Sequence, residues 1–203
     1  MNTVTTFIDV IRHGEPVGGR RYRGYSVDDP LTDTGWAQMR AAIPESPQWQ
    51  HIITSPLTRC LAFTEELAGK LQIPFDIVDN IKEIGFGDWE GKTPEQILAE
   101  DSDALRYFYK DPVNNRPEGA EPLASFSARV WQAYQDVLKQ HRGKHVLMVA
   151  HAGVARAIMA NILQISLDNV YSRLRIEYGA IVSSSVDDGE PPKLLIKAPE
   201  QAC

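Results

Sequence analysis

The chain has 203 residues and a formal net charge of −6, with 21 Lys and Arg residues against 27 Asp and Glu residues. Its 43% hydrophobic and 24% charged residues are ordinary for a globular protein and exclude disordered, collagen-like and coiled-coil classes. The acidic balance argues against nucleic acid or an anionic membrane surface as the main partner, because a phosphate backbone requires an extended cationic face.

The cysteines and the apolar runs indicate the compartment. Cys60 and Cys203 are too few for a disulfide framework and lack metal-ligand spacing, which favours a reducing environment. The first residues lack the features of a signal peptide, and no apolar run approaches the roughly 20 residues that span a bilayer. We therefore expect one cytoplasmic domain over residues 1–203, without a membrane segment, and a homo-oligomer is compatible with this composition.

The first half of the chain alternates short apolar runs with amphipathic segments. In chain order it predicts a strand over residues 6–11, a helix that begins within 30–38, a strand over 51–54, a helix over 57–71 and a strand over 75–84. Thr32 or Thr34 is the expected N-cap of the first helix, and Pro56 is expected at the first position of the second.

The second half continues this alternation after a glycine-rich stretch. In chain order it predicts irregular structure over 83–91, a helix over 94–109, a surface loop over 110–122, a helix over 123–141, a strand over 144–150, a helix over 154–163 and strands over 178–185 and 193–198. The near-continuous apolar run at 144–150 is typical of a central parallel strand. The whole pattern predicts an α/β fold in which helices cover both faces of one parallel or mixed sheet.

Four side chains share one position relative to the predicted elements. His13 and His151 each follow a strand directly, Arg59 lies in the first turns of a helix that follows a strand, and Glu83 lies at the end of another. Ligands of open α/β sheets bind at the carboxyl ends of the strands. We expect these side chains to converge on one pocket.

Such a pocket has the chemistry of a phosphoryl site. The planar guanidinium fork matches phosphate oxygens. The arginines concerned are Arg12 and Arg59, with Arg20, Arg21 or Arg23 as further contacts. Nearby cations keep a histidine neutral, so that its Nε2 can attack phosphorus, whereas a substrate phosphate close to Glu83 favours the protonated carboxyl that a general acid needs.

The same residue types also occur in structural roles. A single histidine after a strand is more often structural than catalytic, and His51 is expected to have a structural role at the start of its strand. His141 and His145 suggest a metal pair, but Gly143 separates them and no third ligand is apparent, so no metal site is expected. The aromatic residues either line a pocket or belong to the core: Trp89, Tyr107, Phe108 and Tyr109.

A four-residue signature and four further ordered motifs resemble those of the histidine phosphatase superfamily, which includes phosphoglycerate mutases, fructose-2,6-bisphosphatases and alpha-ribazole phosphatases. The motifs are Arg12-His13-Gly14-Glu15, Asp29-Pro30-Leu31-Thr32-x-x-Gly35-x-x-Gln38, Ser55-Pro56-Leu57-x-Arg59, Glu83-x-x-Phe86-Gly87-x-Trp89-Glu90-Gly91 and His151-Ala152-Gly153-Val154, the first of which defines the signature. They span roughly residues 7 to 160 and occur in the family's order.

The resemblance implies a fold and a set of roles. The fold is a three-layer α/β/α sandwich with a mostly parallel central sheet, and the reaction has two steps and needs no metal or other cofactor. His13 is the implied nucleophile and Glu83 the implied proton donor. The implied phosphate-binding residues are Arg12, Arg59, His151 and Ala152, with Arg20, Arg21, Arg23 and Trp89 as substrate contacts.

The chain departs from the family pattern at two places. Many relatives carry an asparagine where this chain has Gly19, so one phosphate or substrate contact is either absent or supplied by Arg20 or Arg21. The familiar Arg-Ala-x-Gln-Thr run is replaced by Arg59-Cys60-Leu61-Ala62-Phe63, which keeps the arginine.

The segment after the acid motif bears on the reaction and the substrate. Residues 91–122 are short for the insertion that encloses phosphoglycerate in mutases, which favours hydrolysis. The stretches at 85–91 and 117–130 are most similar to the alpha-ribazole phosphatase branch, whose substrate is alpha-ribazole 5′-phosphate. The alternatives are a broad-specificity sugar or nucleotide phosphatase, a phosphoglycerate mutase, and a non-catalytic protein that binds a phosphorylated ligand.

Overall fold

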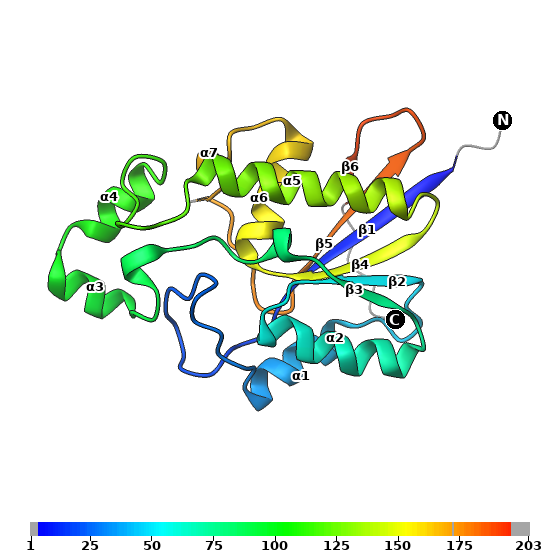
Figure 1. The fold of residues 1–203 in the computed structure, drawn as a ribbon, viewed down its shortest axis with the longest axis horizontal. Coiled ribbons are helices and arrows are strands. Elements are labelled where there is room, and N and C mark those ends of the chain that lie inside the picture. Colours follow the sequence, from blue (N-terminus) through cyan, green and yellow to red (C-terminus); the bar gives the residue numbers. More distant parts are fainter. Residues whose placement is uncertain (1–3, 172, 196–203) are drawn as a thin grey trace, which may run out of the picture.

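A mixed β-sheet forms the centre of the molecule (Figure 1). The computed structural model describes residues 4–171 and 173–195, and in these residues the sheet has six strands in the order β3-β2-β4-β1-β5-β6. The strands are β1 (Thr5–Arg12), β2 (His51–Thr54), β3 (Phe75–Ile77), β4 (His145–Ala150), β5 (Ile181–Asp187) and β6 (Lys193–Leu195). Strands β1 to β4 run parallel, and β5 and β6 run antiparallel to their neighbours. The predicted mostly parallel sheet, with the strand at 144–150 near its centre, is confirmed.

Helices cover both faces of this sheet, as predicted (Figure 1). Helices α1 (Asp33–Ala42) and α2 (Thr58–Leu71) pack on one face, and α5 (Leu123–Gln140) and α6 (Ala152–Leu163) pack on the other. Because side chains alternate along a strand, neighbouring residues of β1 enter different cores. Val10 joins the cluster under α5 and α6, and Ile11 joins the cluster under α1 and α2.

Shorter helices lie between these layers and the loops. They are η1 (Asp79–Ile81), η2 (Gly87–Trp89), α3 (Pro94–Glu100), α4 (Ala104–Lys110) and α7 (Leu167–Tyr171). Helix α7 was not predicted. Within the described ranges, no helix combines the length and the apolar character of a membrane span.

The start of α1 agrees with the prediction, whereas the start of α2 does not. Thr32 caps α1, because its hydroxyl accepts a hydrogen bond from the Gly35 N–H at 2.9 Å. Pro56 lies before the N-cap of α2 instead of at its first helical position. A carboxylate from a distant loop caps this helix: Asp28 accepts hydrogen bonds from the backbone N–H and the hydroxyl of Thr58, at 2.8 and 2.7 Å. No local sequence signal marks such a cap.

The strand predicted over residues 75–84 is shorter in the structure. It ends at Ile77, and Val78 donates a last hydrogen bond to Thr54 before the chain turns into η1. Ile81 and Ile84 are fully buried in the core, so the apolar pattern continues without the strand. The prediction was too long because buried apolar residues of a non-strand segment give the same sequence pattern as a strand.

The helix predicted over residues 94–109 is two helices. The Asp101 carboxylate accepts a hydrogen bond from the Asp103 N–H at 2.9 Å, which forms a turn between α3 and α4. Aspartate favours such local hydrogen bonds over the helical ladder. The predicted loop over 110–122 follows α4 and contains only an isolated bridge at Ala120.

Two boundaries differ near the C-terminus, and a third falls outside the described residues. Helix α6 begins at Ala152, directly after His151, and β5 begins at Ile181 instead of residue 178. The strand predicted over 193–198 is described only to Leu195, and residues 196–198, like Cys203, lie outside the described residues.

Candidate active site

Two histidines leave the sheet side by side. Strands β1 and β4 are parallel neighbours, and Arg12 pairs with Ala150 at their carboxyl ends, so the next residue of each strand is a histidine. The His13 N–H donates to the Ala150 carbonyl at 2.9 Å. The rings of His13 and His151 meet edge to face with centroids 5.2 Å apart, and both residues are buried. The expected convergence of these histidines is therefore present.

The His13 ring has a defined tautomer. Nδ1 lies 2.7 Å from the Gly14 carbonyl, which can only accept, so Nδ1 carries the proton and Nε2 carries the lone pair. Burial, then the charges of Arg59 and Arg12, lower the pKa of His13 well below its usual value. The ring is consequently neutral at pH 7, and its Nε2 is available as a nucleophile.

The loop after His13 rests on the first turns of α1. A Cβ added to Gly14 would lie 2.0 Å from the Gly35 carbonyl oxygen, so the two backbones approach too closely for a side chain at this position. The Glu15 N–H donates to the Gln38 side-chain oxygen at 2.8 Å. The first two motifs of the sequence therefore form one structural unit that fixes the histidine loop.

His151 lies behind His13 and is fully buried. Its Nε2 is 2.8 Å from the hydroxyl of Ser55, which follows β2, so three adjacent strands supply this part of the site. Burial, followed by the charge of Arg59, lowers the pKa of His151 well below its usual value. His151 is not among the described residues that line the cavity, so it borders the site through His13.

Cys60 is buried beside His151. Its thiol donates to the Ala150 carbonyl, with Sγ 3.4 Å from the oxygen. Burial raises the pKa of Cys60 to about 12, so the thiol stays protonated at pH 7. Cys60 thus has no nucleophilic character.

The side chain of Arg12 is half-buried at the edge of the cavity. Its Nη1 donates to the Ile176 carbonyl at 2.5 Å, and its Cζ lies 3.9 Å above the centre of the Tyr178 ring. Its Nε is buried and has no hydrogen-bond partner among the described residues. A buried donor without a partner is costly, and an anionic ligand removes that cost.

Arg59 is held even more deeply, with 1% of its surface exposed. Nη2 donates to the Gly24 carbonyl at 2.8 Å and Nη1 donates to the Val27 carbonyl at 3.2 Å, which orients the guanidinium toward the cavity that it lines. Its Nε also lacks a partner within the described ranges. Arg12 and Arg59 thus bring two positive charges to the cavity next to His13.

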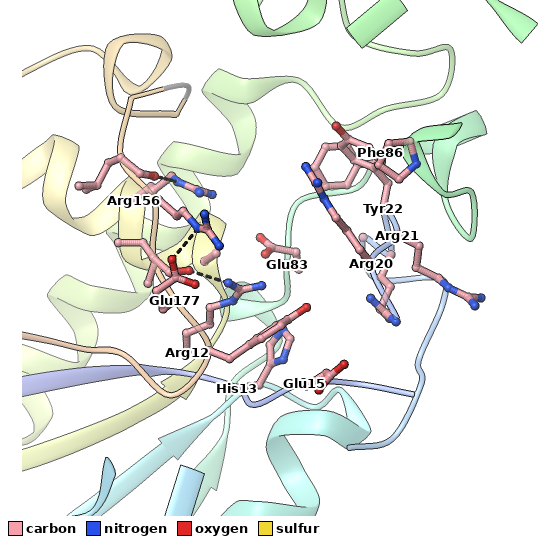
Figure 2. Close-up of a pocket in the computed structure, with 18 of the residues that line it drawn as sticks. Arg12, His13, Glu15, Arg20, Arg21, Tyr22, Glu83, Phe86, Arg156 and Glu177 are labelled. Atoms are coloured by element: carbon pink, nitrogen blue, oxygen red, sulfur yellow. Dashed lines mark hydrogen bonds and ion pairs between the residues drawn. The ribbon is translucent and has the colours of Figure 1, made fainter. Parts of the chain in front are cut away.

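Glu83 enters the same cavity from the segment after η1. Figure 2 shows its side chain between Arg12 and Arg20. Its carboxylate accepts hydrogen bonds from the Ile84 N–H at 3.0 Å and from the Gly153 N–H at 3.2 Å. The two N–H donors hold the carboxylate beside the first turn of α6.

The cavity has a volume of about 600 Å³ and three kinds of wall (Figure 2). Its arginines are Arg12, Arg20, Arg21, Arg23, Arg59, Arg156, Arg173 and Arg175. Its carboxylates are Glu15, Glu83 and Glu177. Its aromatic side chains and proline are Tyr22, Phe86, Phe108, Tyr109, Tyr178 and Pro94. An acidic protein therefore has a strongly cationic cavity, which suits an anionic ligand with an organic part.

The three arginines predicted as substrate contacts differ in how far their guanidiniums are already bonded to the protein. Arg20 lines the cavity and is exposed, and Arg21 lines it while its guanidinium donates to the Gly18 carbonyl at 2.8 Å. Arg23 also lines it, but its guanidinium is paired with Asp29 at 2.9 Å and bonded to loop carbonyls. Arg20 and Arg21 are thus placed to contact a ligand, whereas Arg23 holds the loop.

Ala152 and Trp89 also have different outcomes. Ala152 lines the cavity at the first position of α6, and its contact with phosphate stays a prediction. Trp89 does not line it, and the predicted substrate contact is wrong. Its ring packs against the rings of Tyr22 and Phe108, 5.3 and 5.2 Å away, and so supports the aromatic wall from behind.

Sequence reasoning missed the residues before β5. Because β5 is antiparallel, it begins at the edge where β1 and β4 end, and residues 173–178 therefore lie at the cavity. Arg156, in the second turn of α6, was also missed; its Nε donates to the Leu174 carbonyl at 2.8 Å and so joins the two segments. The only sequence signal was the pair Arg173 and Arg175 just before a strand.

Comparisons with known proteins identify the family. Residues 8–198 match the model of the histidine phosphatase superfamily, branch 1. The structure of Bacillus stearothermophilus YhfR is similar, with 30% identity, a TM-score of 0.85 and coverage of 95% of this chain and 96% of that one. Phosphoserine phosphatase 1 of Hydrogenobacter thermophilus is 29% identical over 80% of this chain and 79% of its own. The adenosylcobalamin/alpha-ribazole phosphatase of Escherichia coli K12 is 24% identical over 84% of this chain and 85% of its own. The chain belongs to the histidine phosphatase superfamily, and it is a phosphatase with the phosphoglycerate mutase-like fold.

Proposed function

We propose that this phosphatase hydrolyses phosphomonoesters of a small metabolite through a phosphohistidine on His13, without a metal ion. One observation carries the proposal: the Nδ1–H of His13 is fixed on the Gly14 carbonyl, and its Nε2 is left free beside the guanidiniums of buried Arg59 and half-buried Arg12. A neutral, oriented imidazole next to a dianion site is what attack on phosphorus requires.

The first step transfers the phosphoryl group to the protein. Nε2 of His13 forms a bond to phosphorus while the ester P–O bond breaks, and Arg12 and Arg59 neutralise the charge on the phosphoryl oxygens. Glu83 donates its proton to the departing oxygen, which leaves as an alcohol. The backbone N–H of Ala152, at the start of α6, donates a further hydrogen bond to the phosphoryl group.

The second step hydrolyses the phosphohistidine and regenerates the free enzyme. The Glu83 carboxylate takes a proton from a water molecule, whose oxygen attacks phosphorus as the bond to His13 Nε2 breaks. Inorganic phosphate leaves, and Glu83 is protonated again. Neutral His151 supports the buried edge of the His13 ring throughout, because a second cation there would oppose formation of the charged phosphohistidine.

Trapping the intermediate tests this mechanism. The wild type, quenched during turnover of a phosphate-labelled aryl ester in the presence of a chelator, should carry an acid-labile, alkali-stable label. His13→Asn should carry none and lose at least about three orders of magnitude in kcat. His145→Asn, a histidine outside the cavity, is the matched control. Full activity of the His13 variant, or activity that disappears with chelator, would refute the proposal.

We further propose alpha-ribazole 5′-phosphate as the leading substrate candidate. The aromatic wall of Tyr22, Phe86 and Phe108 faces the same cavity as His13 and suits stacking against a flat ring system. The relative named as an alpha-ribazole phosphatase is consistent with this choice.

A second substrate class is favoured by a different observation. Arg156, Arg173 and Arg175 line the cavity in addition to the arginines beside His13. They suit a second anionic group, such as the carboxylate of phosphoserine or of a phosphoglycerate derivative, and relatives are named for both kinds of substrate.

One panel separates these candidates. We would compare kcat/KM for alpha-ribazole 5′-phosphate, phosphoserine, 3-phosphoglycerate, sugar phosphates and nucleotides. The leading proposal predicts the highest value for alpha-ribazole 5′-phosphate and a selective loss in Phe108→Ala. The second class predicts a preference for carboxylated esters and a selective loss in Arg173→Gln. Interconversion of phosphoglycerates faster than phosphate release would indicate a mutase, and tight binding without turnover would indicate a binding protein.

A further inference from the structure

A second cluster of side chains that can bind a metal lies away from the active site, near the end of the sheet at which β2 begins. His51 is the first residue of β2, Asp76 is the middle residue of β3, and His141 directly follows α5. Asp76 is paired with Ile53, which shares the face of β2 with His51 because side chains alternate along a strand. Helix α5 covers that same face, so three segments distant in sequence meet there.

The three side chains are close together. His51 Nε2 lies 2.7 Å from an Asp76 carboxylate oxygen, and the rings of His51 and His141 have centroids 4.2 Å apart. One ligand atom from each residue can be chosen so that all three lie within 4.8 Å of one another. The sequence spacing had suggested His145 as the partner of His141, but His145 Nε2 bonds the Asp9 carboxylate at 2.9 Å instead.

His141 supplies an independent observation. Only 6% of it is exposed, and both of its ring nitrogens are buried without a hydrogen-bond partner among the described residues. An imidazole has a donor and an acceptor, so burying both without partners is unfavourable. A metal ion bound to one nitrogen gives this side chain the partner that the protein does not supply.

We propose that His51, Asp76 and His141 bind a divalent transition metal, with Zn²⁺ as the first candidate. Two imidazoles and one carboxylate are ligands that Zn²⁺ commonly takes, with a water in the fourth position. Zinc–ligand bonds of about 2.0–2.1 Å place tetrahedral ligands roughly 3.3–3.4 Å apart. The widest spacing of up to 4.8 Å must therefore shorten by as much as about 1.5 Å, and the 2.7 Å contact of His51 with Asp76 must widen by about 0.6 Å. Asp76, 60% exposed, is free to make that movement, and its exposure gives the ion an entry path.

The charges around the cluster limit its affinity. The negative charge of Asp76 attracts a cation to the cluster. The positive charge of exposed Lys144, which acts on His141, repels a cation and so weakens its binding. The proposed ion acts as a clip that joins β2, β3 and the end of α5, and it stabilises the fold without entering the active-site chemistry.

Calorimetric titration of Zn²⁺ into the chelator-treated, dialysed full-length protein tests the site. We expect saturable binding of one ion, which falls at least tenfold in affinity in Asp76→Asn, His51→Gln and His141→Gln and tightens in Lys144→Gln. Asp79→Asn is the matched control, because Asp79 is also an exposed carboxylate, lies three residues away and pairs with Lys82. A hundredfold excess of free Zn²⁺ over Kd should raise Tm by about 5–10 °C in the wild type and the control only.

Two further measurements keep the result specific. Circular dichroism and phosphatase activity without Zn²⁺ should be unchanged in Asp76→Asn, which shows that the exposed position tolerates the change. Binding should persist in His13→Asn, since the active-site histidines are not the ligands. The proposal is overturned if the wild type binds no Zn²⁺ saturably, or if Asp76→Asn and His141→Gln bind as the wild type does.

Discussion

Gly153 lies directly against the Glu83 carboxylate. A Cβ added to Gly153 would be 2.2 Å from Glu83 Oε1, and the Gly153 N–H already donates to Oε2 at 3.2 Å. The glycine two residues after His151 therefore leaves the space in which Glu83 reaches the cavity. The motifs that contain Glu83 and His151 are linked by this contact as well as by the ligand that they are proposed to share.

Gly153→Ala should displace the carboxylate while the protein remains folded. The added methyl group meets the movable end of Glu83, which can rotate away, so we expect kcat/KM to fall by about tenfold to a hundredfold through loss of the positioned acid. Steady-state kinetics on an aryl phosphate and thermal unfolding measure the two effects.

A matched variant controls for the substitution itself. Gly69 is an exposed position inside α2, and a Cβ there would meet nothing within 4 Å. Gly69→Ala should keep full activity and raise stability by about 0.5–1 kcal/mol. Equal activity in the Gly153 and Gly69 variants would contradict the assignment of Glu83 as the acid.

The pH dependence of kcat/KM should be bell-shaped, with an acidic-to-neutral optimum. The pKa of His13 lies well below its usual value of 6.5, so its Nε2 stays unprotonated as the pH falls through 6.5. The acidic limb should therefore lie well below pH 6.5. The alkaline limb follows from the proposed mechanism, in which the departing oxygen must receive a proton from the protein. Glu83→Gln should lower kcat/KM and remove the alkaline limb, and an unchanged profile would move the acid elsewhere, with Glu15 as the next candidate.

The sequence was informative where a functional residue follows a parallel strand. His13 and His151 could be predicted to meet because each follows an apolar run, and the carboxyl ends of parallel strands share one edge. The cap of α2 could not be predicted, because Asp28 reaches Thr58 from 30 residues away. The sequence around Thr58 does not indicate a contact with so distant a residue.

The cationic rim of the cavity was missed for a topological reason. Residues 173–178 reach the active site only because β5 runs antiparallel to β1, and periodicity does not reveal strand direction. The role expected for Trp89 was wrong for a related reason. An aromatic side chain next to a motif can support the wall from behind, as Trp89 does through Tyr22, and only the packing distinguishes the two cases.

Tyr178 should contribute to activity through its ring. The ring lies under the Arg12 guanidinium at 3.9 Å and beside the His13 ring at 5.9 Å. Tyr178→Leu removes the cation–π contact and should reduce kcat/KM by about twofold to thirtyfold. Tyr178→Phe keeps the ring and should retain most of the activity. If the Phe variant is as impaired as the Leu variant, the hydroxyl and not the ring is responsible.

Acid should destabilise the protein through the two buried histidines. The pKa values of His13 and His151 are lowered in the folded state, whereas the unfolded chain has values near 6.5, so the unfolded state binds more protons below that pH. The free energy of unfolding must then fall as the pH decreases from about 6.5, by about 1.4 kcal/mol per pH unit for each histidine that stays neutral. Urea unfolding between pH 5 and 8 measures this slope. His151→Asn should make the slope shallower by about one proton below pH 6 and leave it unchanged between pH 7 and 8, where both histidines are neutral in either state. A variant with the slope of the wild type would show that His151 is protonated in the folded protein.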